Sequence, residues 1–131
     1  MEAVHYFNEQ GIAANRIILC HLDRTHYDTG FHREVLSTGA YLCYDSINRL
    51  KYLSNQQETD LILAMLAAGY GEQLLLSLDT TRARLRAYDG TMGLDYIQKV
   101  FLPELRKLGI SETDIQHMTK DNAAKALQMK E

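Results

Sequence analysis

The sequence has little of several features that mark particular classes of protein. Two cysteines in 131 residues are too few for a disulfide framework, so we expect Cys20 and Cys43 to be buried, reduced thiols in a cytoplasmic protein. A formal net charge of −3 offers no basic face to a phosphate backbone, which argues against nucleic acid as a partner. No apolar run approaches the roughly 18 residues of a membrane span, so no membrane partner is expected. What remains, 46% hydrophobic and 24% charged residues, is typical of one globular domain.

One order of features occurs three times along the chain: a helical stretch, a glycine, an apolar strand and then a polar residue. The expected strands are "RIILCHLD" (16–23), "AYLCYDS" (40–46) and "EQLLLSLDTT" (72–81). Because these segments are apolar almost throughout, we expect strands that are buried on both faces and pair in parallel as neighbours. Helices are expected at 55–68, at 93–109 and from 111 to 130. The pattern predicts an α/β fold.

Polar side chains follow each of the three strands. His21 and Asp23 follow the first, Asp45 the second and Asp79 the third. Ligands of parallel α/β folds bind beyond the carboxyl ends of the strands, so we expect His21, Asp45 and Asp79 at one common edge. One interpretation is that these residues cap helices or bond to loop backbone; the other is a site for a cation such as Zn²⁺. His21 and Asp79 alone make an incomplete metal site, and the chain has no His-x-His or His-x-x-x-His pair.

Four segments resemble the C-terminal part of phosphotriesterase-family proteins, which belong to the amidohydrolase superfamily. They are "GIAANRIILCHLDRT", "GAYLCYDSINRLKY", "LLLSLDTTR" and "FLPELRKLGISETDIQHMTKDNAAKAL". The segments look closest to the lactonase-like branch of that family. The resemblance implies a TIM-type (β/α)₈ barrel, of which this chain supplies the sixth, seventh and eighth strands with their helices. Such a barrel needs about 250 residues, so we expect residues 1–131 to be a single partial domain, either a truncated product or a portion of a longer enzyme.

The resemblance also implies roles for two strand-end residues. His21 matches the metal-binding histidine that closes the sixth strand, and Asp79 matches the aspartate that closes the eighth. Asp79 is implied to bind metal and to act as the catalytic residue that moves a proton from water to the leaving group. The implied cofactor is a divalent metal, zinc, in a site that is binuclear in the complete enzyme. The implied activity is metal-dependent hydrolysis of ester or lactone bonds in a small-molecule substrate.

Two departures from the family pattern narrow the expected substrate. Arg24 and Ser46 stand where the triesterases have the aspartate and the histidine of a proton relay, which argues against triesterase activity. Some members of the lactonase-like branch hydrolyse phosphorylated sugar lactones. Lys51 and Arg82 are then candidates for holding a substrate phosphate, the alternative being that both are solvated surface charges.

The chain lacks counterparts of the family's first-strand His-x-His, fourth-strand lysine and fifth-strand histidine, so we expect it to be inactive alone. Ile18, Leu42 and Leu76 are expected to point into a barrel interior that other strands would fill. The chain should therefore form a homo-oligomer or pair with a complementary barrel half. Two other interpretations stay open. One is a non-catalytic remnant that binds a ligand or a partner chain, and the other is a small doubly wound regulatory domain, a fold that normally has about five strands.

Overall fold

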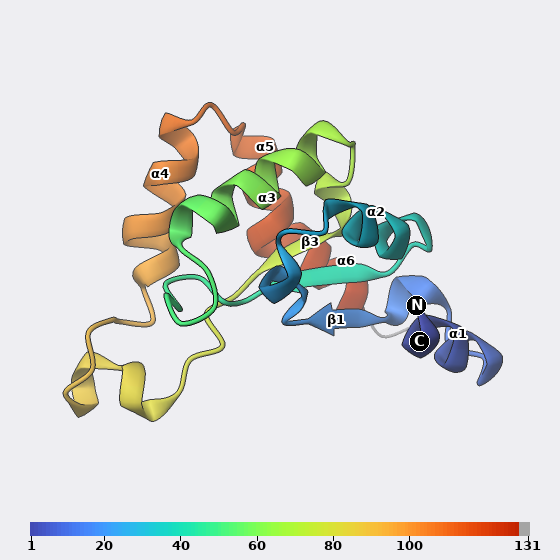
Figure 1. Cartoon of the computed structure of the whole chain (residues 1–131), viewed down its shortest axis with the longest axis horizontal. Coiled ribbons are helices and arrows are strands. Elements are labelled where there is room, and N and C mark those ends of the chain that lie inside the picture. Colours follow the sequence, from blue (N-terminus) through green and yellow to red (C-terminus); the bar gives the residue numbers. More distant parts are fainter. Residues whose placement is uncertain (129–131) are drawn as a thin grey trace.

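The computed structural model describes residues 1–128. A three-stranded parallel sheet lies at the centre of the folded molecule (Figure 1). Its strands are β1 (Ile18–Cys20), β2 (Tyr41–Tyr44) and β3 (Leu74–Leu76), in the order β1-β2-β3. Both pairs of neighbours are parallel, with Leu19 beside Leu42 and Leu42 beside Leu74. The prediction of three parallel, adjacent strands is therefore confirmed, although each strand is shorter than its apolar segment.

Six α-helices accompany the sheet in the described residues. They are α1 (Glu2–Glu9), α2 (Thr29–Ser37), α3 (Asn55–Ala67), α4 (Leu102–Lys107), α5 (Glu112–Gln116) and α6 (Asn122–Leu127). Two π-helical turns, Ile97–Phe101 and His117–Asp121, lead into α4 and α6. Short 3₁₀ turns lie at Ala14–Arg16, Leu22–Thr25, Gly71–Gln73, Arg82–Arg84 and Arg86–Tyr88.

The predicted helices agree with these elements to different degrees. The helix expected at 55–68 is α3, and Ser54 begins it with a capping box in which the Ser54 side chain accepts from the Gln57 amide. The helix expected at 93–109 begins only at Ile97. The helix expected from 111 to 130 runs through α5, a π-helical turn and α6 as far as Leu127, and residues 129 and 130 lie outside the described residues. Gly39 and Gly69 follow α2 and α3 with φ of +93° and +87°, the left-handed conformation expected where glycine ends a helix.

The side chains of the sheet pack into two separate clusters, one on each face. Leu42 and Tyr44, fully buried, join the main core with side chains of α2 and α3 such as Val35 and Ile62. Tyr41, Cys43 and Leu75 pack on the other face, with Ala126 of α6. The sheet is therefore covered by α2 and α3 on one face and partly by α6 on the other.

Two expectations about side-chain direction are wrong. Leu42 and Leu76 pack on the helix side, in or against the main core, rather than toward a barrel interior; only Ile18 packs with the opposite cluster. The reason is the alternation of side chains along a strand, which sends Leu42 and Cys43 to opposite faces. Cys20 is exposed, not buried, because β1 is an edge strand; Cys43, on the central strand, is buried as expected.

The segment between β3 and the first π-helical turn projects away from the sheet, and Figure 1 shows it in yellow at the edge of the molecule. Within residues 1–128, no helix has the length and apolar character needed to cross a membrane.

Candidate functional site

The backbone at two strand ends adopts an unusual conformation. His21 directly follows β1 with φ +66°, and Asp79 follows β3 with φ +40°. Residues with a side chain rarely adopt this left-handed region, and where they do the cost is of order 1–3 kcal/mol and the positions cluster at functional sites. His21 and Asp79 are the two residues that the family resemblance selects as metal ligands.

A hydrogen bond fixes the orientation of the His21 ring. Its Nδ1 lies 2.7 Å from Oδ1 of Asp45, and since an ionised carboxylate only accepts, Nδ1 carries the proton and donates. The His21 side chain is 45% exposed and that of Asp45 is 4% exposed. Burial raises the pKa of Asp45, and the hydrogen bond from His21 acts in the opposite direction. A histidine held this way presents the lone pair of Nε2, the arrangement found where a carboxylate supports a metal-binding histidine.

Asp23 ties together the loops that follow β1 and β2. Its side chain is fully buried, and Oδ2 accepts from the amides of Asp45 (2.6 Å) and Ser46 (2.5 Å). Its Oδ1 accepts from the Ser46 hydroxyl at 3.0 Å. For Asp23, the interpretation as a residue that bonds to loop backbone is therefore confirmed, and this bonding holds Asp45 in place beneath His21.

Asp79 is paired with two arginines. Its Oδ2 lies 2.8 Å from Nη1 of Arg49 and 3.4 Å from Nη2 of Arg24. The same Arg24 nitrogen lies 3.2 Å from Nδ1 of His21, a close approach only, because that nitrogen already donates to Asp45. These contacts place His21, Asp45 and Asp79 at one edge of the sheet, where the strand-end rule predicts them.

The two residues that depart from the triesterase pattern contact each other. Nε of Arg24 donates to the Ser46 hydroxyl at 3.3 Å, and the Arg24 guanidinium lies over the ring of Tyr52 at 4.1 Å from the centroid. Arg24 and Ser46, which the resemblance aligns with the aspartate and the histidine of the relay, therefore form a guanidinium–hydroxyl pair. A guanidinium does not transfer protons at neutral pH, whereas it binds anions well.

The candidate phosphate-binding residues lie farther out. Lys51 is exposed, with Nζ 5.5 Å from the centroid of Tyr52, the ring on which Arg24 stacks. Arg82 is exposed too and lies over Tyr88 at 4.2 Å. No contact within residues 1–128 joins either side chain to His21 or Asp79, so their role in substrate binding stays a prediction.

Sequence reasoning missed two arginines that organise the site. Besides its ion pair, Arg49 donates to the backbone oxygen of Asp79 at 3.1 Å. Arg84 donates to the backbone oxygens of Leu78 (2.5 Å) and Ile47 (3.0 Å), and so joins the loops that follow β2 and β3. The one available signal was the position of these arginines shortly after strands, which many surface arginines share.

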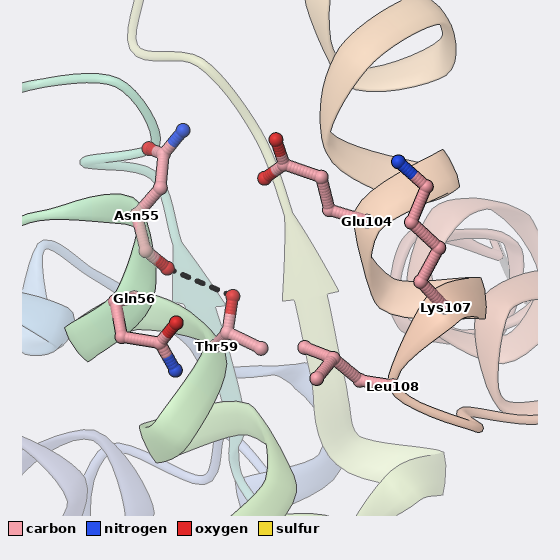
Figure 2. A pocket seen from close by; sticks show the side chains of 6 residues that line it. All are labelled: Asn55, Gln56, Thr59, Glu104, Lys107 and Leu108. Carbon is pink, nitrogen blue, oxygen red and sulfur yellow. Dashed lines mark hydrogen bonds between the residues drawn. The ribbon is translucent and has the colours of Figure 1, made fainter.

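A separate cavity of about 300 Å³ lies between α3 and α4 (Figure 2). Figure 2 shows Glu104 and Lys107 of α4, and Leu108 directly after it, facing the first turns of α3, where the Thr59 hydroxyl donates to the Asn55 backbone oxygen at 2.8 Å. The cavity shares no lining residue with the strand-end cluster, so it is not part of the candidate site.

Comparisons with known proteins agree on one family. The model of the phosphotriesterase family matches residues 1–127. An N-acetyltaurine hydrolase from Dictyostelium discoideum is 28% identical over 97% of this chain and 37% of its own length. The fold is similar to part of two solved barrels. One is a lactonase from Listeria monocytogenes (28% identity, TM-score 0.91, 99% of this chain and 41% of that one). The other is the Escherichia coli phosphotriesterase homology protein, solved with phosphate in its active site (26% identity, TM-score 0.90, 97% and 43%).

The chain spans about two-fifths of the length of these relatives: 44% of the curated Escherichia coli protein and 37% of the Dictyostelium discoideum hydrolase. The similarity thus covers nearly all of this chain and a minority of each relative. The fold observed here is an α/β unit similar to part of a TIM barrel.

Proposed function

This chain belongs to the phosphotriesterase family of hydrolases, and we propose that it supplies strands six to eight of a (β/α)₈ barrel that hydrolyses ester or lactone bonds with a divalent metal. On this proposal residues 1–131 are one partial domain. The observation that carries it is the meeting of His21 and Asp79 at one sheet edge, both in the left-handed backbone region and both beside Arg24.

The donor atoms present fit the metal that the family implies. His21 donates from Nδ1 to Asp45 and so presents Nε2, and imidazole and carboxylate are ligands that zinc prefers. Both guanidinium contacts of Asp79 go to Oδ2, so Oδ1 is the oxygen through which Asp79 would meet a cation or accept a proton. A zinc ion held by these residues would supply Lewis acidity toward the carbonyl oxygen and lower the pKa of a bound water. In the proposed reaction Asp79 would accept a proton from the attacking water and deliver it to the leaving group.

The substrate that we propose carries an anionic group beside its scissile carbonyl, as a phosphorylated sugar lactone does. The support is Arg24, which faces the strand-end cluster where the triesterases have a carboxylate, and which holds Ser46 instead of a relay histidine. We propose that Lys51 and Arg82 contact the phosphate from farther out. Lys51 lies near the ring of Tyr52, on which the Arg24 guanidinium stacks. The relative described as a lactonase agrees with the proposed bond, and the relative described as a hydrolase of N-acetyltaurine agrees with the proposed anionic group, because N-acetyltaurine carries a sulfonate beside its amide.

The described residues provide two ligands of a site that needs more, so we propose that the chain alone turns over no substrate. The other ligands would come from the rest of a barrel, in a longer polypeptide, a complementary half or an assembly of copies. A non-catalytic role is the alternative, and one observation favours it: the charge of Asp79 is already balanced by Arg24 and Arg49 without a metal. That role would be binding of a ligand or a partner chain.

A chimera separates the two candidates. Residues 1–127 replace the matching two-fifths of the Listeria monocytogenes lactonase, and metal content and lactone hydrolysis are measured on the folded product. We expect His21→Ala to lose bound metal, and Asp79→Asn to lower kcat far more than it raises KM, because proton transfer belongs to the reaction step. Tyr27→Phe, at a residue that is 80% exposed, serves as the matched control and should change neither quantity. A chimera that folds cooperatively yet shows the same metal content and turnover in all three variants would overturn the catalytic proposal in favour of the non-catalytic one.

A further inference from the structure

Two thiols lie side by side on the face of the sheet that α2 and α3 do not cover. Cys20 ends β1, Cys43 lies in β2, and the two are direct partners in the parallel register. Paired positions of adjacent strands point to the same face, and Cys43 packs with the cluster opposite the main core. Both cysteines are free.

A carboxylate joins this pair. Asp45 follows β2 by one residue, and one of its oxygens and the two sulfur atoms all lie within 4.8 Å of one another. Cys43 and Asp45 are buried, whereas Cys20 is exposed, so the group is rigid on one side and open to solvent on the other. The open side gives a cation a path to the sulfur atoms.

The identity of these donors selects the kind of cation. Two sulfurs and one carboxylate suit Zn²⁺ and Cd²⁺, which bind thiolate and carboxylate ligands together. The same donors suit Mg²⁺ and Ca²⁺ poorly, because those ions need several oxygen ligands. Three protein ligands with one open position are also the usual number for a zinc site that is not purely structural.

We propose that Cys20, Cys43 and Asp45 form a binding site for a zinc-group cation, Zn²⁺ or Cd²⁺, separate from the ligands His21 and Asp79. Each thiol releases its proton to solvent when it ligates the ion. Asp45 also accepts from His21, so the two sites share one residue. A cation bound by Cys20, Cys43 and Asp45 therefore changes the orientation of the His21 ring, because Asp45 holds that ring.

The test is a Cd²⁺ titration of the 131-residue chain, kept reduced with a phosphine and followed by the ultraviolet charge-transfer absorbance of cadmium–thiolate bonds. We expect one Cd²⁺ per chain, displaced by excess Zn²⁺. Cys20→Ser should weaken binding at least about 100-fold, because loss of even an outer-shell partner of a metal costs 10–100-fold. Cys43→Ala should do the same.

Asp79→Asn is the matched control, since it removes a ligand of the proposed catalytic metal and leaves both thiols, Asp45 and the hydrogen bond from His21 to Asp45. It should keep the charge-transfer band at full height, whereas a band that disappears in Asp79→Asn would place the cation at the other site and overturn the proposal. A chain that shows no band at saturating Cd²⁺, or a band unchanged in Cys20→Ser, would overturn it too. Cys20 is exposed, so this variant decides the matter even if Cys43→Ala fails to fold.

Discussion

Replacement of Glu58 by glutamine should stabilise the fold, and the gain should grow as the pH rises. Glu58 lies on α3 and is fully buried, and neither of its carboxyl oxygens has a hydrogen-bond partner within residues 1–128. Burial, reinforced by the charges of Asp23 and Asp45, raises the pKa of Glu58 to about 9 from an ordinary value of 4.5. The side chain is therefore neutral in the folded chain at pH 7 and ionised in the unfolded chain.

The magnitude follows from this difference in proton binding. Between pH 4.5 and about 9 the folded state holds a proton that the unfolded state releases, so stability is fully present below 4.5 and falls as the pH rises, by about 1.4 kcal/mol per pH unit. At pH 7, about 2.5 units above 4.5, the loss amounts to roughly 3 kcal/mol. That is a large share of the 5–15 kcal/mol typical of a domain. Glutamine has nearly the same shape and no charge to lose, so Glu58→Gln should recover most of this amount at pH 7 and almost none at pH 4.5.

Urea unfolding followed by circular dichroism measures the effect at several pH values, at one fixed protein concentration because association would shift the apparent stability. The difference in unfolding free energy between Glu58→Gln and the parent chain should widen with pH. Asp60→Asn is the control on the same helix: Asp60 is exposed, so its variant should follow the parent at every pH. Parallel pH profiles for the parent and Glu58→Gln would refute the reasoning, because they would mean that Glu58 already ionises in the fold.

Three further results are expected. Asp23→Ala should destabilise the chain by about 2 kcal/mol or more in urea unfolding, since it leaves the amides of Asp45 and Ser46 without their acceptor; an unchanged midpoint would contradict the role of Asp23 as an anchor. A thiol reagent should label one cysteine fast and one only on unfolding, and Cys20→Ser should remove the fast phase, whereas two equally fast thiols would contradict the burial of Cys43. Sedimentation should show species larger than the 15.0 kDa monomer, because β1 and β3 leave open sheet edges; a monodisperse monomer that unfolds cooperatively would disprove this expectation.

Local sequence was sufficient to predict the elements whose causes are local. A helix at 55–68 follows from Ser54 as a cap and an apolar stripe, and α3 starts at Asn55 as a result. Gly39 and Gly69 end helices because only glycine adopts their backbone conformation without strain. The strands follow from apolar runs too long and too uniform to leave in water. Each apolar run is followed by polar residues, so the sequence also predicts the strand ends and places His21, Asp45 and Asp79 there.

The contacts that make these residues into a site were decided by tertiary structure alone. Arg24 reaches His21, Ser46 and Asp79 across as many as 55 positions of sequence, and no local pattern distinguishes it from a surface arginine. Leu42 faces the helices because side chains alternate along β2 and α3 packs on the face that carries Leu42. The sequence of β2 is apolar at every position, so it does not predict which of its side chains face the helices. Exposure of Cys20 likewise depends on β1 lying at the edge of the sheet, and Cys43 is buried because its strand lies in the middle. Sequence determined where the chain turns polar, and only the packing of distant segments determined which of those polar groups meet.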